Sequence, residues 1–423
     1  MNPTAVGETG PAQGVRLLVA DQVVTAATPG PKRGRALDDL RVYAPGAVAI
    51  AGARIAGVGA ADELRRRWPG SPVERWAGHV LAPGFVDSHT HAVFGRWRLD
   101  EYEWRARGRT YGEIHAAGGG ILASVRDLRA RSEEELLALA RPRLRRMLEH
   151  GTTTAEVKSG YGLTVEDELK ILRVVRALAR EGPLDLVPTF LGAHAVPPEY
   201  ADRRAAYVEL VVREMIPAVA EEGWAEFCDV FVEPGAFTVD EAERILEAAR
   251  EHGLRPKVHA DEFECSGGAE LAARIGAVSA DHLGAVSEAG IAALAASGTV
   301  ATCLPGTLFF LGRTRYAPAR RLIAAGAAVA LATDFNPGTS PTANLQTVLS
   351  LAVQQMAMTP AEAFVAATVN GAAAIGRADG TGTLAAGAPA DIVAFRASDF
   401  REVPYRYGEN HCAAVWKRGT RVV

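Results

Sequence analysis

The sequence predicts an α/β protein: a (β/α)8 TIM-like barrel with a small composite β-sandwich that the N- and C-terminal segments form together. Two observations predict this fold. The middle of the chain alternates short apolar, strand-like runs with longer helix-like segments, the pattern of parallel strands joined by helical crossovers. Both ends of the chain instead carry short β-branched segments separated by turn residues.

Short strand-like segments lie near both termini of the chain. "VRLLVADQVVTAA" and "AVAIAGARIAGVGA" predict strands near the N-terminus, and "GTLAAGAPADIVAFRA" and "CAAVWKRGTRVV" have the same character near the C-terminus. The insertion at 28–39, "TPGPKRGRALDD", receives no function. The predicted organisation is a disordered tail (1–14), the N-terminal part of the sandwich (15–82), the barrel (83–380) and the C-terminal part of the sandwich (381–423).

Eight strand-like runs follow one another through the middle of the chain, each leading toward a candidate helix. They are "LAPGFVDSHTH", "TTTAEVKS", "LDLVPTFLGAH", "CDVFVEP", "RPKVHADE", "AVSADHL", "GTVATCLP" and "AVALATDFNP". Nearly every run ends in a residue that can bind a metal or move a proton: His89, His91, Lys158, His194, Glu233, His259, Glu262, His282 and Asp334. All strands of such a barrel end on one face, so we expect these side chains to meet at one mouth.

Composition excludes several classes of function. The chain has 423 residues and a net charge of -4, which gives no general basic surface for nucleic acid. Its four cysteines lack CxxC spacing, which argues against a disulfide framework and favours the cytoplasm. The first residues lack the pattern of a signal peptide, and no apolar run is long enough to span a membrane. We expect a small-molecule substrate and a homodimer, without nucleic acid or membrane as partner.

The metal hypothesis rests on four residues. His89 and His91 are two positions apart, so in an extended strand both imidazoles point to the same side. Such a pair alone is weak evidence, because strand-end histidines often bond only to the backbone. His259 and Asp334, at the ends of the fifth and eighth runs, complete a set of nitrogen and oxygen ligands that suits zinc, and also iron or manganese.

Two further residues are candidates for proton transfer. Glu262 follows His259 by three positions, close enough to take a proton from a metal-activated water and pass it to a leaving nitrogen. Its alternative role is a solvated loop carboxylate. His282 either orients the water or stabilises negative charge, or it is a hydrogen-bonding partner behind the ligands. Lys158 allows a carboxylated, metal-bridging lysine, but its early position favours a structural or substrate-facing role and a single metal.

Polar residues beyond the strand ends are candidates for substrate binding. Arg98, on the loop after "HTH", has the planar geometry that holds a carboxylate, and Arg96 lies beside it. Tyr161, Asn336, Gly338 and Thr339 also lie just beyond strand ends and suit a small polar heterocycle.

Several strings resemble the amidohydrolase superfamily of metal-dependent hydrolases. They are "PGFVDSHTH", "GGGILASVRDLRA", "GTTTAEVKSGYGL", "FLGAHAVPPEY", "HADE", "SADHL" and "ATDFNPGTSPTANLQ", and together they are most similar to the members that hydrolyse 4-imidazolone-5-propanoate to N-formimino-L-glutamate in L-histidine degradation. The resemblance covers the chain from about Leu17 to the C-terminus. It implies one Zn2+ or Fe3+ per subunit, held by His89, His91, His259 and Asp334. It also implies proton transfer by Glu262 and His282, and substrate contacts from Arg98, Tyr161, His194, Glu262, Asn336, Gly338 and Thr339.

Two alternatives stay open at this point. The same metal set, with Lys158, fits another cyclic-amide hydrolase of the dihydroorotase or hydantoinase kind. A barrel that binds a small anion or a metal without catalysis also fits.

Overall fold

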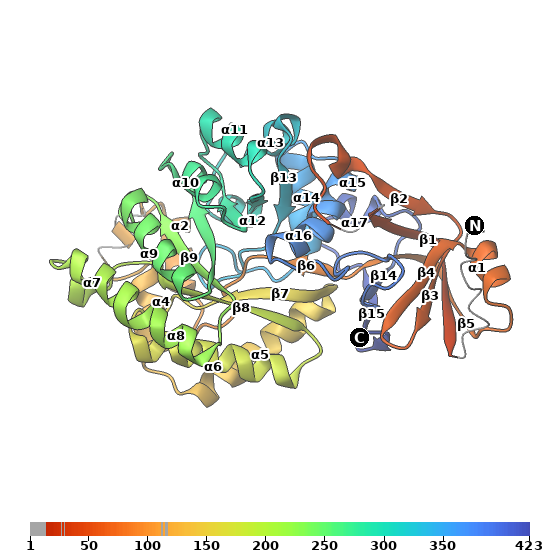
Figure 1. The fold of residues 1–423 in the computed structure, drawn as a ribbon, viewed down its shortest axis with the longest axis horizontal. Coiled ribbons are helices and arrows are strands. Elements are labelled where there is room, and N and C mark those ends of the chain that lie inside the picture. Colours follow the sequence, from red (N-terminus) through yellow and green to blue (C-terminus); the bar gives the residue numbers. More distant parts are fainter. Residues whose placement is uncertain (1–13, 27, 29, 111–112, 115–116) are drawn as a thin grey trace, which may run out of the picture.

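The computed structural model describes residues 14–26, 28, 30–110, 113–114 and 117–423. Apart from Gly14, the predicted tail at 1–14 lies outside the described residues. The chain forms a parallel barrel flanked by a second sheet to which both termini contribute (Figure 1). Within the described residues, no helix combines the length and the apolar character needed to cross a bilayer.

The barrel sheet has eight parallel strands among the described residues, and each strand coincides with one of the eight predicted runs, although β9 begins one residue before its run. In chain order they are β6 (Phe85–Asp87), β7 (Thr152–Lys158), β8 (Asp185–Ala193), β9 (Phe227–Val232), β10 (Arg255–Ala260), β11 (Ser279–His282), β12 (Val300–Cys303) and β13 (Ala328–Leu331). Each strand pairs with its neighbour in sequence, from β6 through to β13. The predicted barrel is confirmed.

Helices follow the strands and cover the outside of the barrel (Figure 1). Their apolar faces are buried, and several begin at a serine or threonine cap, as α5 does at Ser132 and α9 at Thr238. The helices are α2 (Leu99–Ala106), α4 (Ile121–Arg129), α5 (Glu133–Glu149), α6 (Val165–Glu181), α7 (Arg204–Leu210), α8 (Ile216–Glu222), α9 (Val239–Glu251), α10 (Gly268–Arg274), α11 (Glu288–Ala296), α12 (Pro305–Phe310), α13 (Ala319–Ala325), α14 (Leu345–Gln355), α15 (Pro360–Ala366), α16 (Val369–Ala374) and α17 (Glu402–Tyr405).

The second sheet takes strands from both ends of the chain, as the sequence predicts. Its strands are β1 (Val15–Ala26), β2 (Leu40–Tyr43), β3 (Gly46–Ala51), β4 (Arg54–Ala60), β5 (Val73–Pro83), β14 (Ile392–Phe395), β15 (Cys412–Lys417) and β16 (Thr420–Arg421), with α1 (Ala61–Arg67) after β4. β14 pairs with β5, which joins the C-terminal strands to the N-terminal ones. The sequence patterns did not predict β2 or most of β5.

The first predicted run is split between the two sheets at Gly84. Residues 81–83 belong to β5 of the second sheet, and the barrel strand β6 begins at Phe85. A side chain at Gly84 would meet Thr153 Oγ1 at 2.2 Å, so only glycine allows the chain to cross here. The sequence predicts one strand over this run, because an apolar stretch shows no boundary where the strands on both sides are buried.

Contacts beyond the strand ladder join β13 to β6 and complete the barrel. Asp87 accepts hydrogen bonds from the backbone nitrogen of Thr333 (3.0 Å) and from its hydroxyl (2.6 Å). The backbone nitrogen of Asp334 donates to His89 O at 3.0 Å. The contacts that join β13 to β6 therefore involve one predicted metal ligand from each side, Asp334 after β13 and His89 after β6.

Residues 30–39 of the insertion pack against the end of the barrel opposite the site. Residues Gly34–Asp38 form a short 3-10 helix, labelled η1. Lys32 N donates to Asn370 Oδ1 (2.7 Å), and Asn370 Nδ2 donates to Lys32 O (2.9 Å). Gly34 N donates to Ala327 O, directly before β13. These contacts give the insertion a structural role at the amino end of the last barrel strand.

Candidate active site

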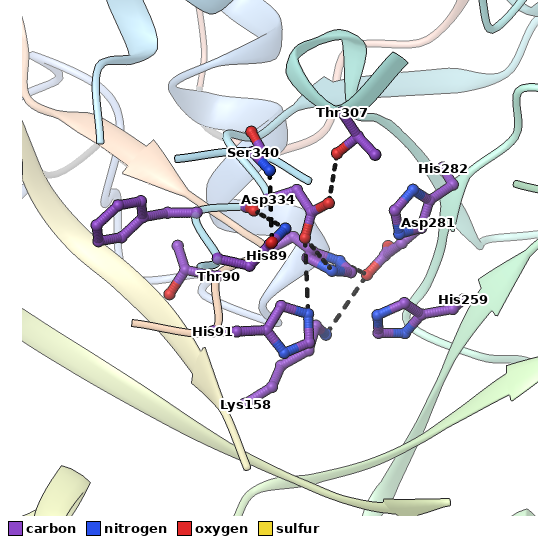
Figure 2. A network of polar contacts seen from close by, with 12 residues as sticks. His89, Thr90, His91, Lys158, His259, Asp281, His282, Thr307, Asp334 and Ser340 are labelled. Atoms are coloured by element: carbon purple, nitrogen blue, oxygen red, sulfur yellow. Dashed lines mark hydrogen bonds and ion pairs between the residues drawn. The ribbon is translucent and has the colours of Figure 1, made fainter. Parts of the chain in front are cut away.

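The four predicted metal ligands come together at the carboxyl ends of the barrel strands (Figure 2). His89 and His91 follow β6, His259 lies in β10, and Asp334 follows β13. The Nε2 atoms of His89 and His91 lie 3.5 Å and 3.6 Å from Asp334 Oδ1. Ring nitrogens of the three histidines lie within 4.8 Å of one another. The cluster thus has the dimensions of a single small site.

The chemistry of these atoms fits a metal ion. His89 Nε2 and His259 Nε2 are buried, and neither has a hydrogen-bond partner among the described residues. Buried polar atoms are almost always paired, so two such atoms side by side indicate a missing partner. His89 Nδ1 lies 2.7 Å from Asp281 Oδ2. A neutral ring that donates its Nδ1–H to that carboxylate turns the lone pair of Nε2 toward the cluster.

Burial also keeps His89 and His91 neutral, which is the form of histidine that binds metals. The pKa of His89 lies well below its ordinary value of 6.5, because of burial first and of the positive charge of Lys158 second. The pKa of His91 is lowered in the same way, by burial and then by His194.

Asp334 is held by contacts on both sides. Thr307 Oγ1 donates to Asp334 Oδ2, which leaves Oδ1 facing His89 and His91. Burial raises the pKa of Asp334 to about 6, although the hydrogen bond from Thr307 acts in the opposite direction. Its backbone φ of 52° lies in the left-handed region, a strained state for a residue other than glycine that is typical of functional sites.

The two predicted proton-transfer residues face each other beside this cluster. Glu262 Oε1 lies 3.6 Å from His282 Nδ1, and both side chains are buried. Burial, followed by the negative charges of Asp334 and Glu233, raises the pKa of Glu262 well above its usual range. Such a carboxyl group binds a proton more readily than a solvated glutamate does, which suits a proton carrier.

Glu233, which the sequence places among the strand-end groups, holds the loop that carries Glu262. The backbone nitrogens of Glu262 and Glu264 donate to its carboxylate, at 3.1 Å and 2.7 Å. Its role in the structure is to fix the loop after β10.

Three predicted substrate residues lie along one side of the cluster. The ring of His194 stacks on that of His91, with 5.1 Å between centroids, and Tyr161 lies 5.6 Å from His194. Burial raises the pKa of Tyr161, and the positive charge of Arg98 partly opposes this shift. Burial lowers the pKa of His194 to about 3, and the charge of Arg98 is among the smaller causes that lower it further. A cationic group and a phenol are therefore both near the imidazoles.

The predicted contacts Asn336, Gly338 and Thr339 form one tight loop after Asp334. Asn336 Oδ1 accepts hydrogen bonds from the backbone nitrogens of Gly338 (2.9 Å) and Thr339 (2.7 Å). Asn336 Nδ2 donates to Asp334 O at 2.7 Å. Asn336 therefore shapes the loop that carries a predicted ligand, and its contact with substrate stays a prediction.

Sequence reasoning missed the side chains that support the ligands: Thr307, Glu156, Asp229 and Asp281. Asp281 and Asp229 lie behind His89 and His259, and Glu156 lies beside Lys158. The available signal was an acidic residue inside an otherwise apolar strand, as in "CDVFV", because such a residue is rarely buried without a partner. Thr307 gave no signal, since a single threonine after a strand is commonplace.

Fold and site together define a class of protein, and comparison with known families identifies it. The model of the amidohydrolase family matches residues 80–420, and the chain belongs to that family. Two solved structures share the fold at low sequence identity. Escherichia coli guanine deaminase has a TM-score of 0.70 at 14% identity and covers 97% of this chain and 99% of its own. An adenosine deaminase from Xanthomonas campestris, with bound zinc, has a TM-score of 0.67 at 19% identity and covers 96% and 92%.

Within that family the chain is an imidazolonepropionase relative over nearly its whole length. It is 49% identical to the imidazolonepropionase of Geobacillus thermodenitrificans over 410 residues, which is 96% of each chain. Identity to the enzyme of Rubrobacter xylanophilus is also 49%, over 96% of this chain and 98% of that one. An imidazolonepropionase-like composite domain of bacteria matches residues 46–70, in the second sheet. The narrower resemblance seen in the sequence strings is confirmed.

Proposed function

We propose that the protein hydrolyses 4-imidazolone-5-propanoate to N-formimino-L-glutamate, using one Zn2+ or Fe3+ ion held by His89, His91, His259 and Asp334. The observation that carries the proposal is the meeting of three buried imidazoles and one carboxylate at the strand ends of a chain 49% identical to imidazolonepropionases. Nitrogen and oxygen ligands of this kind suit both ions.

A metal ion held by His89, His91, His259 and Asp334 would supply the Lewis acidity that makes water nucleophilic at neutral pH and polarises the ring amide carbonyl. Glu262 accepts the proton of the attacking water and returns it to the ring nitrogen as the C–N bond breaks. His282, 3.6 Å from Glu262, stabilises the negative charge that develops on the carbonyl oxygen. Arg98 pairs with the propanoate, and Tyr161 and His194 line the ring. Gly338 and Thr339 contribute contacts from the loop that Asn336 holds.

The surroundings of Lys158 favour a single ion. Its amine lies 2.7 Å from Asp229 Oδ2 and 2.8 Å from Glu156 Oε2, and the side chain is fully buried. Burial lowers the pKa of this amine, but the facing carboxylates outweigh burial and raise the pKa above its usual range. A protonated amine is not nucleophilic, so it does not take up carbon dioxide to become a bridging carbamate. This argues against the two-metal alternative.

The decisive experiment measures metal content and turnover on the same preparation. We expect about one equivalent of zinc or iron per chain, hydrolysis of the imidazolone, loss of activity after chelation and its return with added metal. Dihydroorotate and hydantoin serve as control substrates. Metal binding without consumption of the imidazolone would overturn the proposal, and turnover of a control substrate with two metals would support the alternative.

Two further expectations accompany this function. We propose that the protein works in the cytoplasm, where thiols stay reduced; its four cysteines are all free, and three of them are buried. The homodimer expected from the sequence stays a prediction, which sedimentation velocity checks.

A further inference from the structure

Directly beneath the ligand cluster, the barrel interior holds five ionisable side chains that are all fully buried. We call them the buried ion network: Glu156, Lys158, Asp229, Lys257 and Asp281. They point inward because residues two apart in a strand share a face, and each lies at such a position in β7, β9, β10 or β11. Barrels of this kind are usually filled here by branched apolar side chains, and each buried charge costs free energy. A role in stabilising the barrel core therefore does not by itself explain why five charged side chains are buried here.

The network contacts two of the predicted metal ligands from behind. Asp281 Oδ2 lies 2.7 Å from His89 Nδ1. Asp229 Oδ2 lies 2.9 Å from His259 Nδ1, and Asp229 Oδ1 accepts the backbone nitrogen of His259 at 3.1 Å. In each pair a carboxylate oxygen lies close to the Nδ1 atom of the ring.

Lys158 joins these two pairs, and Figure 2 shows its contact with Asp281. Its ammonium nitrogen lies 2.7 Å from Asp229 Oδ2 and 3.6 Å from Asp281 Oδ2, the same two oxygens that face the histidines. Glu156 is its third partner, at 2.8 Å. Lys257, equally buried, does not make this link: it lies 3.8 Å from Asp281, 3.2 Å from Glu156, and donates to two backbone carbonyls.

We propose that Lys158 is a positioning residue that sets the orientation of His89 and His259 together, through Asp281 and Asp229. The inference rests on the proposed metal site. One ammonium group is hydrogen-bonded to Asp229 and forms a longer ion pair with Asp281, and in this proposal each carboxylate holds its imidazole with the Nε2 lone pair toward the ion. Partners behind a ligand typically change metal affinity by about 10–100-fold, so one lysine behind two ligands should act on affinity directly.

The first test compares Lys158→Met with Lys257→Met, two changes that each remove one buried ammonium group. Zinc affinity is measured by competition with a chelator, and the visible spectrum of the Co2+-loaded protein reports ligand geometry. We expect Lys158→Met to weaken zinc binding by about 10–100-fold and to shift the cobalt bands. Lys257→Met should retain the native bands and bind zinc at least about tenfold more tightly than Lys158→Met. Equal losses in both variants would show that Lys158 only balances charge, and would overturn the proposal.

A second test does not need Lys158 to be changed, in case its loss prevents folding. Asp229→Asn and Asp281→Asn keep the shape of each side chain, and their effects on zinc affinity are measured singly and together. If Lys158 couples the two ligands, the double variant loses several-fold less than the product of the single losses, because either change already releases the lysine. The pair Asp229→Asn and Thr307→Val is the control, since Thr307 holds Asp334 without contacting the network. Multiplicative losses in both pairs would overturn the proposal.

Failure of the proposed function is distinguishable from failure of this inference. Native protein that binds neither zinc nor iron would reject the metal site itself. If the native protein binds metal and Lys158→Met has the same affinity and the same cobalt spectrum, only the role of Lys158 is rejected.

Discussion

The substitution Gly338→Ala tests the role of Arg98 through a steric contact. A methyl group at Gly338 would lie 1.5 Å from Arg98 Nη2 and 1.8 Å from Cζ and Nε. Ordinary contact between such atoms requires about 3.5 Å, so the guanidinium must move by about 2 Å. The group that must move is the end of a flexible side chain, and the backbone at Gly338 has no positive φ that excludes alanine. The variant should therefore fold normally with Arg98 displaced.

Displacement of about 2 Å breaks any hydrogen bond between the guanidinium and a bound carboxylate. Loss of one partner of a desolvated charge pair costs about 2–5 kcal/mol, so KM should rise by at least roughly 30-fold with a smaller change in kcat. Arg98→Ala should give a similar rise, and the double variant should be no worse than Arg98→Ala alone, because both changes remove the same contact. Steady-state kinetics and thermal unfolding of the three variants provide the measurement. An unchanged KM in Gly338→Ala, or a double variant whose losses multiply, would refute the assignment of Arg98 to the substrate.

Three further predictions address other parts of the molecule. Thr307→Val removes the hydroxyl that holds Asp334 and should weaken zinc affinity by about 10–100-fold while the unfolding temperature changes little; unaltered affinity in a chelator titration would contradict this. Glu262→Gln should lower kcat by about 100-fold or more with metal content near native, as proton transfer requires, and a comparable loss of bound metal would make Glu262 a ligand instead. Lys417→Met breaks a buried ion pair with Asp391 and should cost about 3–5 kcal/mol in the free energy of unfolding without changing KM, as chemical denaturation and kinetics together would show.

The sequence predicts the order of the barrel strands because buried parallel strands appear as apolar runs. A polar residue at the end of such a run indicates the carboxyl end of a strand, where the active site of a barrel lies. His259 and Asp334 were found in this way. The boundary at Gly84 was not, because the strands on either side of it are both buried and both apolar. The β5 strand (73–83) was missed for the opposite reason, since much of it is exposed and polar and carries no clear period.

The supporting carboxylates were hidden from the sequence for a different reason. Asp281 lies 192 positions from His89, and nothing local in "SADH" indicates which distant ring it faces. Its environment depends on strand register, which only the folded barrel fixes. For Lys158 the sequence favours a structural or substrate-facing role over a metal-bridging one, but it does not indicate the partners of this residue, which lie on three different strands, β7, β9 and β11.

The contacts between the β6 and β13 segments, which close the barrel, lie beside the ligand cluster. Between these segments the strand ladder gives way to irregular contacts, and one of them runs between the backbones of His89 and Asp334, both predicted ligands. Irregular backbone there frees the chain from the strict alternation of a strand, so Asp334 can adopt its left-handed conformation and turn its carboxylate toward the imidazoles. The opposite wall cannot bend in this way, because His259 lies within a paired strand. There Asp229 lies beside the His259 ring, as Asp281 lies beside the ring of His89, and each buried carboxylate lies near the buried ammonium group of Lys158. The buried charges inside this barrel thus support imidazole ligands both on a strand and beyond a strand end, whereas the strained backbone serves the carboxylate ligand Asp334.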